Sequence, residues 1–196
     1  MPNKISIKLR LYDRLKSTNE SIRIIEKITN SCRRNRLPNE LNENYMLNLE
    51  IKPKEGLGTI LFGEIPENLA KILGQPETAE DIRTDDDLKT TILSYPEQGI
   101  TVFLEGLIEP IVSNFDVDNE NATLFGVKVF TKTEAEIKQL MLDNGYKVFE
   151  EDEEEWGEKR LSCDDALMDF YFIEGKLAAV NWGVYIKDDG TIDSTI

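Results

Sequence analysis

The side chains that carry most protein chemistry are scarce in this chain, which has two cysteines and no histidine. Histidine is the commonest general base and metal ligand near neutral pH, so its absence excludes catalytic groupings of the Ser-His-Asp and Cys-His types. Cys32 shares the apolar side of a predicted helix with Ile28, which favours a buried structural thiol, although two arginines follow it. Cys163 precedes two aspartates, whose negative charge raises the pKa of a thiol. We therefore expect neither cysteine to act as a nucleophile.

The most conspicuous charged run is a stretch of consecutive acidic residues from Glu150 to Glu155. Neighbouring like charges repel one another, and the run has no apolar side, so it predicts a solvated hairpin loop. The functional alternative is a negative lobe that attracts a basic partner over a long range and so raises the association rate. In that case Glu153 and Glu154 are candidate contact residues.

Two short motifs begin like ligand-binding loops and then depart from the required pattern. Asp116 opens a segment similar to a calcium-binding EF-hand loop, but Asn121 stands where the loop needs Gly and Val127 where it needs Glu. The Gly56-Leu57-Gly58 segment lacks the third glycine of a dinucleotide fingerprint, because Leu61 takes that place. It also lacks the Gly-Lys-Ser/Thr ending of a phosphate loop. We therefore expect no zinc, haem, nucleotide or other cofactor.

The segment from Met168 to Trp182 is the strongest candidate for a binding surface. If Glu174 and Gly175 form a two-residue hairpin turn, Tyr171 lies opposite Ala178. One face of the hairpin is then apolar and suited to the core, through Phe170, Phe172, Leu177 and Ala179. The other face carries mixed aromatic and charged side chains, which are typical of protein-binding surfaces, namely Asp169, Tyr171, Lys176 and Trp182. The alternative is that the N-terminal element covers this second face, and a register error of one residue would exchange the two faces.

Composition narrows the classes of partner. The hydrophobic fraction of 40% supports a globular core, and the net charge of -15 argues against nucleic acid or an anionic membrane as partner. The charge is uneven, because residues 1–36 hold ten basic and three acidic residues, whereas the rest of the chain holds 13 basic and 35 acidic ones. This asymmetry indicates internal docking or a bipolar binding surface. The lack of a cysteine pair and of an apolar signal segment predicts a reduced, cytoplasmic location.

Two sequence anchors recur in the same order and predict an internal duplication. Thr59-Ile60-Leu61-Phe62-Gly63 returns as Thr123-Leu124-Phe125-Gly126, and Phe103-Leu104-Glu105-Gly106 returns as Phe172-Ile173-Glu174-Gly175. Each first anchor precedes a short helical pattern, and each second anchor lies between two strand-like runs. Anchors that keep their order while their spacing drifts indicate a repeated module.

The elements expected around these anchors fall into three stretches. Residues 1–56 predict a β-α-β element with strands at Ile5–Leu11 and Tyr45–Ile51 and a capped helix from Ser17 to Arg34. Residues 57–120 form the first predicted module, with a strand at Gly58–Phe62, a helix from Pro66 to Gly74, and strands at Leu88–Tyr95, Ile100–Leu104 and Leu107–Phe115. Residues 121–196 form the second, with a strand at Thr123–Phe130, a helix from Thr133 to Gly145, and strands at Tyr146–Phe149, Lys159–Cys163, Leu167–Ile173 and Lys176–Tyr185.

A helix followed by an antiparallel meander, made twice, resembles the tandem modules of the β-lactamase-inhibitor-protein-like class. The resemblance rests on the two helices Pro66–Gly74 and Thr133–Gly145 and on the Glu-Gly hairpins at Glu105 and Glu174, and it covers residues 57–186. In that class the sheets of the two modules form a surface that grips a partner protein, so the resemblance implies such a surface here. The chain departs from secreted members in lacking a signal sequence and a cysteine pair within a module.

These observations predict an α+β fold with two duplicated helix-plus-antiparallel-sheet modules and an N-terminal β-α-β element. The function they favour is a non-enzymatic, cytoplasmic protein-binding module, for example an immunity or inhibitor protein that acts on a basic partner. Two other classes stay open, a hydrolase that uses paired carboxylates and a structural or assembly subunit. Two acids converging in a pocket would favour the hydrolase, and an extensive self-association surface would favour the subunit.

Overall fold

The computed structural model describes residues 47–83, 89–106, 109–153, 158–187 and 190–193. Most of the regular structure in these ranges is strand. The two α-helices are α3 (Pro66–Leu73) and α4 (Glu134–Asp143). The strands are β1 (Glu50–Lys52), β2 (Gly56–Leu57), β3 (Ile60–Leu61), β4 (Thr78–Arg83), β5 (Lys89–Tyr95), β6 (Ile100–Glu105), β7 (Ile111–Val117), β8 (Thr123–Leu124), β9 (Val127–Lys128), β10 (Phe149–Glu153), β11 (Glu158–Cys163), β12 (Met168–Ile173) and β13 (Lys176–Gly183).

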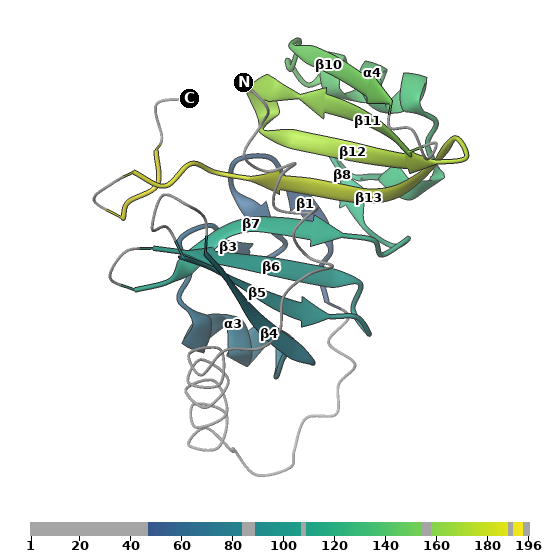
Figure 1. Ribbon diagram of the computed structural model, residues 1–196. Coiled ribbons are helices and arrows are strands. Elements are labelled where there is room, and N and C mark those ends of the chain that lie inside the picture. The colour runs from purple at the N-terminus through teal and green to yellow at the C-terminus, as the bar shows by residue number, and fades with distance from the viewer. Residues whose placement is uncertain (1–46, 84–88, 107–108, 154–157, 188–189, 194–196) are drawn as a thin grey trace.

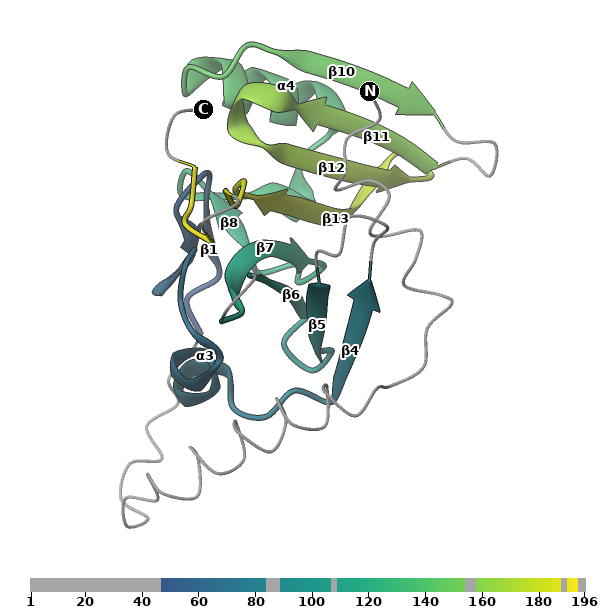
Figure 2. The same ribbon diagram turned by 60° about the vertical axis from the view of Figure 1, so that its left-hand side comes forward.

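An eight-stranded antiparallel sheet dominates the molecule (Figure 1), with the strand order β10-β11-β12-β13-β7-β6-β5-β4. A second, five-stranded sheet has the order β3-β2-β1-β8-β9, and its β1 and β8 are parallel. Helices α3 and α4 and the small sheet lie on the same side of the large sheet (Figure 2). We call the opposite side of the large sheet the outer face.

One main core fills the space between the large sheet and the elements that cover it. Strand residues of alternating position point into this core, including Phe115 of β7, Phe170 of β12 and Leu161 of β11. Helix α4 contributes Ile137 and Met141, and α3 contributes Leu69. Because side chains alternate along a strand, the intervening residues of the same strands lie on the outer face.

The two helices form where the sequence predicts them, and for the predicted reasons. Pro66 occupies the first turn of α3, where a missing N–H costs nothing, and Gly74 ends the helix with a positive φ of 79°. Helix α4 begins with a capping box, in which the Thr133 side chain accepts a hydrogen bond from the Glu136 N–H and the Glu136 carboxylate accepts one from the Thr133 N–H.

The fold class predicted from the sequence is wrong. The described residues are mostly β, and they do not form two duplicated helix-plus-sheet modules of the α+β class. Strand β7 pairs with β13, so the meander β4–β7 and the meander β10–β13 belong to one continuous sheet. The small sheet likewise joins β1 to β8, which lie far apart in the sequence. The repeated anchors Thr59–Gly63 and Thr123–Gly126 are short turn-forming segments of this small sheet and its connections.

The β12–β13 hairpin has the predicted turn but not the predicted register along its whole length. Glu174 and Gly175 both have positive φ, and Phe172 pairs with Leu177 as expected. Between Tyr171 and Phe172 the register shifts, so that Tyr171 pairs with Ala179. The one extra residue in β13 moves the β13 side chains beyond the bulge to the face opposite the predicted one. The prediction that Trp182 lies on the binding face is therefore wrong, since Trp182 lies in the core.

Three further local predictions differ from the structure. The acidic residues Glu150–Glu153 belong to strand β10 and not to a hairpin loop. The predicted strand Thr123–Phe130 is two short strands separated by a turn at Phe125 and Gly126. Strand β4, whose only buried apolar residues are Ala79 and Ile82, was not predicted because these two residues do not alternate. The predicted strand and helix within residues 1–46 lie outside the described residues.

Candidate functional site

The sequence-predicted site residues separate into three locations. Asp169 and Tyr171 lie on the outer face of β12, as predicted, but they are almost fully buried, with 2% and 8% of their surfaces exposed. Lys176 is exposed on the same face, beside the hairpin turn. Glu153 is exposed in β10. Glu154 lies outside the described ranges.

Trp182 connects the two sheets and does not form part of the outer face. It is fully buried, and its indole stacks on Phe115 with ring centroids 5.4 Å apart. Its Nε1 donates a hydrogen bond of 3.2 Å to the carbonyl oxygen of Gly56 in β2. A buried indole N–H requires such a partner, so Trp182 both fills the core and holds the small sheet against the large one.

A polar row crosses four strands of the outer face. Its members are neighbours through the strand register, from β11 to β7: Ser162, Asp169, Asn181 and Asp116. Asn181 also exchanges two hydrogen bonds, of 3.1 and 3.0 Å, with Asn114 of β7, and it donates a longer one of 3.4 Å to Asp116. Most polar side chains on a sheet face are solvated, whereas three of these four are buried.

A second row runs beside the first and contains Arg160 of β11, Tyr171 of β12 and Ala179 of β13. Arg160 Nη2 pairs with Asp152 of β10, and Arg160 Nη1 lies 3.8 Å from Asp169 Oδ1, too far for a hydrogen bond. The Tyr171 hydroxyl, Asp169 Oδ1 and Arg160 Nη1 are buried without a hydrogen-bond partner. Unpaired buried polar atoms are rare, so their occurrence on three adjacent residues marks this part of the face.

The carboxylates of these rows are held in an environment that disfavours their charge. Burial raises the pKa of Asp116 from 3.8 to about 7, a hydrogen bond from Asn181 opposes the shift, and the nearby Asp118 adds to it. Burial also raises the pKa of Asp169, and Ser162 and Arg160 oppose that rise. The pKa of Tyr171 is raised by burial and further by the charges of Asp169 and Asp116. Burial therefore makes Asp116 and Asp169 hold their protons more tightly than free aspartates do.

Strand β10 forms an acidic edge of the large sheet. The Glu151 carboxylate lies 2.9 Å from Lys138 Nζ of α4 and 3.3 Å from Lys159 Nζ of β11, and hydrogen bonds from these two lysines lower the pKa of Glu151. Glu150 and Asp152 pair with β11 residues of the outer face. Opposite charges on α4 and β11 thus hold an acidic sequence in a strand, and acidic side chains on an edge strand also oppose unspecific strand pairing.

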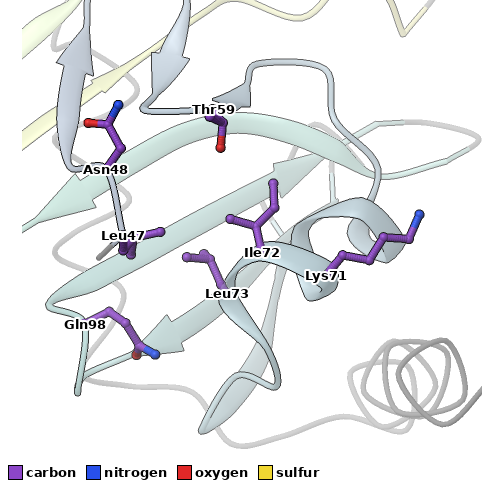
Figure 3. A pocket seen from close by; sticks show the side chains of 7 residues that line it. All are labelled: Leu47, Asn48, Thr59, Lys71, Ile72, Leu73 and Gln98. Carbon is purple, nitrogen blue, oxygen red and sulfur yellow. The ribbon is translucent and has the colours of Figure 1, made fainter. Parts of the chain in front are cut away.

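A pocket of about 600 Å³ lies at the other end of the molecule, between α3 and the turns near it (Figure 3). Leu47, Ile72 and Leu73 turn toward its interior, whereas the Lys71 side chain extends away from it. Its polar lining residues are Asn48, Thr59 and Gln98 in addition to Lys71. None of the described residues that line the pocket is an aspartate or a glutamate.

The remaining candidate for chemistry is Cys163, which is buried in β11. Burial raises the pKa of its thiol to about 12, and the neighbouring Asp165, which accepts a hydrogen bond from Sγ at 3.3 Å, adds to the rise. The predicted direction of this shift is confirmed, and the thiol is protonated at neutral pH. Cys32 lies outside the described part of the chain. Within that part, no three His, Cys, Asp or Glu side chains group as metal ligands.

Sequence reasoning missed the residues that complete the polar rows. Asp116 enters the sequence analysis only as the start of an EF-hand-like segment, and Arg160, Asn181 and Asn114 are not among the predicted site residues. The signal that identifies them is alternation, since Asn114 and Asp116 lie two positions apart in one strand, as do Asp169 and Tyr171 in another. Their proximity depends on the β7–β13 pairing and on the bulge in β13, neither of which has a local sequence signature.

No helix among the described residues is long and apolar enough to cross a membrane. Comparison with known proteins finds no matching protein-family model, no matching curated protein and no matching solved structure.

Proposed function

We propose that this protein is a non-enzymatic, cytoplasmic binding protein that engages a basic protein partner through the β10–β13 end of its outer face. An immunity or inhibitor protein that neutralises a basic enzyme is the concrete form of this function. The free, buried thiol of Cys163 fits a reducing compartment.

The observation that carries the proposal is the composition of this end of the outer face. Ile173, a large apolar residue, is 53% exposed at the end of β12, directly opposite the exposed Lys176. Tyr171, farther along β12, is buried beneath this surface, and beyond β11 lies the acidic edge strand β10. An exposed apolar side chain surrounded by charged ones is typical of protein interfaces. The acidic edge adds long-range attraction for a basic partner.

The test is affinity capture from the native host with the full chain as bait. Ile173→Asp places a charge in the proposed contact, and Leu61→Asp makes the same change at a residue that is 49% exposed on the small sheet. The proposal predicts that the wild type and the Leu61 variant retain a basic protein that elutes with rising salt, and that the Ile173 variant loses it. Equal retention by all three baits, or retention lost only in the Leu61 variant, would contradict the proposal.

A further inference from the structure

The pocket beside α3 leaves apolar side chains accessible at the end of the molecule opposite the proposed binding face. Ile72, the penultimate residue of α3, is 40% exposed, and Leu47 is partly exposed, whereas Leu73 is buried. All three turn toward the interior of one cavity of about 600 Å³ (Figure 3). An apolar segment that enters such a cavity is stabilised there, because both surfaces are removed from water.

The chain itself contains a segment with the complementary pattern. The predicted helix Ser17–Arg34 carries Ile25, Ile28 and Cys32 at positions i, i+3 and i+7. This is the spacing with which an amphipathic helix places its apolar side in a groove. Lys27 falls on the opposite side of the helix, where it stays in water. The segment lies outside the described residues, so its pattern is known from the sequence alone.

The start of the described chain places this segment within reach of the pocket. Leu47 is the first described residue and lines the pocket, so residues 35–46 are the whole connection between its rim and the predicted helix. A connection of that length spans up to about 40 Å when it is extended. A short tether also gives the helix an effective concentration on the order of millimolar at the pocket. Docking within the chain is therefore favoured over docking of a separate molecule.

Charge favours the same occupant. Residues 1–36 hold ten basic and three acidic residues, and the rest of the chain holds 13 basic and 35 acidic ones. At the pocket, the turn that contains Gln98 also contains the exposed Glu97, and the exposed Asp118 donates its N–H to the Gly99 carbonyl oxygen of that turn. A basic segment is thus attracted to this end of its own chain, and the attraction acts within about 8 Å at physiological salt.

We propose that the predicted helix Ser17–Arg34 docks into the pocket beside α3 through its apolar stripe of Ile25, Ile28 and Cys32. The inference concerns the α3 end of the molecule and does not depend on the binding face at the β10–β13 end. It gives the N-terminal element a place other than the outer face, which was the alternative that the sequence left open. The competing occupants of the pocket are the same helix of a second copy and a segment of a separate partner.

Cys32 reports docking directly, because it belongs to the apolar stripe. The experiment measures the rate at which iodoacetamide labels Cys32 in the full chain, by mass spectrometry of the digested protein. The reference is a synthetic peptide of residues 17–36, which has the same thiol and the same neighbouring arginines. Docking predicts labelling about tenfold slower in the full chain than in the peptide. Cys163 is the folding control, since it is fully buried and its pKa is raised to about 12, so it is labelled only when the chain unfolds.

Two pocket variants and one matched control assign the protection to the pocket. Ile72→Asp places a charge in the cavity and should speed Cys32 labelling about fivefold. Leu142→Asp makes a similar change at the penultimate residue of α4, which is 39% exposed, and should leave the rate unchanged. Thr59→Arg, at an exposed lining residue, leaves the core intact and should speed labelling about threefold. If Cys163 is labelled in the Ile72 variant, the Thr59 variant decides the result.

Three outcomes would overturn the proposal. Labelling of Cys32 as fast in the wild type as in the peptide would leave the pocket to a separate partner. Equal labelling in the pocket variants and the Leu142 variant would place the helix elsewhere, for example on the outer face. Protection that is lost on dilution of the wild type would show that the helix comes from a second copy. Protection at every concentration that only the pocket variants remove is the result that docking within the chain predicts.

Discussion

At the scale of single residues, the position of Trp182 shows how one bulge changes the meaning of a sequence. If side chains alternated along β13 without interruption, Trp182 would lie on the outer face with Tyr171. The extra residue Ala178 shifts the register, and Trp182 instead stacks on Phe115 and bonds to Gly56. Its role is therefore in stability, and the outer face keeps only Asp169, Tyr171 and Lys176 of the four hairpin residues predicted to bind.

Replacement of Trp182 by alanine should lower the free energy of unfolding by about 3 to 5 kcal/mol, because it leaves a large cavity between the sheets. Trp182→Phe keeps the contact with Phe115 but loses the hydrogen bond to Gly56, and it should cost about 1 to 3 kcal/mol. Tyr185→Ala, at a residue that is 40% exposed, is the control and should cost less than about 1 kcal/mol. Urea unfolding measures all three, and a Trp182→Ala cost no greater than that of the control would contradict this role.

Asp116 should make stability depend on pH. Its pKa in the folded protein is about 7, above its value of 3.8 as a free group, so the folded state holds the proton more tightly. The stability contributed by the protonated form is fully present below pH 4 and is lost as the pH rises through 7. Between pH 5 and 8, this loss amounts to about 2 to 3 kcal/mol.

The variant Asp116→Asn should lack that part of the pH dependence. The free energy of unfolding of the variant, relative to that of the wild type, should therefore rise from pH 5 to pH 8. Glu97→Gln removes one acid from an exposed turn and should follow the wild type. The measurement is the free energy of unfolding in urea at several pH values. Parallel curves for Asp116→Asn and the wild type would show that this carboxylate is not desolvated.

At the scale of the elements, prediction from sequence succeeded where local chemistry decides the structure. The Pro66–Gly74 helix, the capping box at Thr133 and the turn at Glu174 depend on backbone preferences that single residues express. It failed for β10, where Lys138 and Lys159 offset the repulsion within the acidic run. Those lysines come from α4 and β11, so their effect is visible only in three dimensions.

The pairing of β7 with β13 depends on a glycine, and its replacement should weaken the sheet. A Cβ atom at Gly183 would lie 2.6 Å from Asn114 Nδ2 and 2.7 Å from the Ser113 carbonyl oxygen. Gly183→Ala should therefore cost about 1 to 3 kcal/mol. Ala179→Ser adds a similar volume at a partly exposed position on the same face of β13, and it should cost less than about 1 kcal/mol. Equal melting temperatures for the two variants would show that the strands separate easily at this point.

The acidic edge strand should act on the rate of association and not on the lifetime of the complex. Exposed charges attract a partner over a distance limited to about 8 Å at physiological salt, and they contribute little once contact is made. Replacing Glu150 and Glu153 by glutamine should therefore slow association of the captured partner about two- to tenfold and leave dissociation nearly unchanged. Surface plasmon resonance at low and physiological salt measures both rates. A change confined to dissociation would place these acids inside the contact.

At the scale of the whole molecule, the large sheet has two sides with different roles. One side is occupied by the core with α3, α4 and the small sheet. The other side concentrates its unpaired polar atoms, an exposed isoleucine and an acidic edge at the β10–β13 end. The sequence composition already indicates a basic partner, but the assembly of this end requires the pairing of β7 with β13. Long-range pairing of that kind is what local sequence patterns do not express.

The most direct test of this assignment is site-specific photo-crosslinking in cells of the native host. A photoreactive amino acid replaces the exposed Lys176 on the outer face in one variant and Leu61 on the small sheet in another. A binding face at the β10–β13 end predicts that the probe at position 176 crosslinks to a discrete basic protein, and that the probe at position 61 does not. Crosslinking of that protein only from position 61, or the absence of any protein crosslinked from position 176, would contradict the assignment.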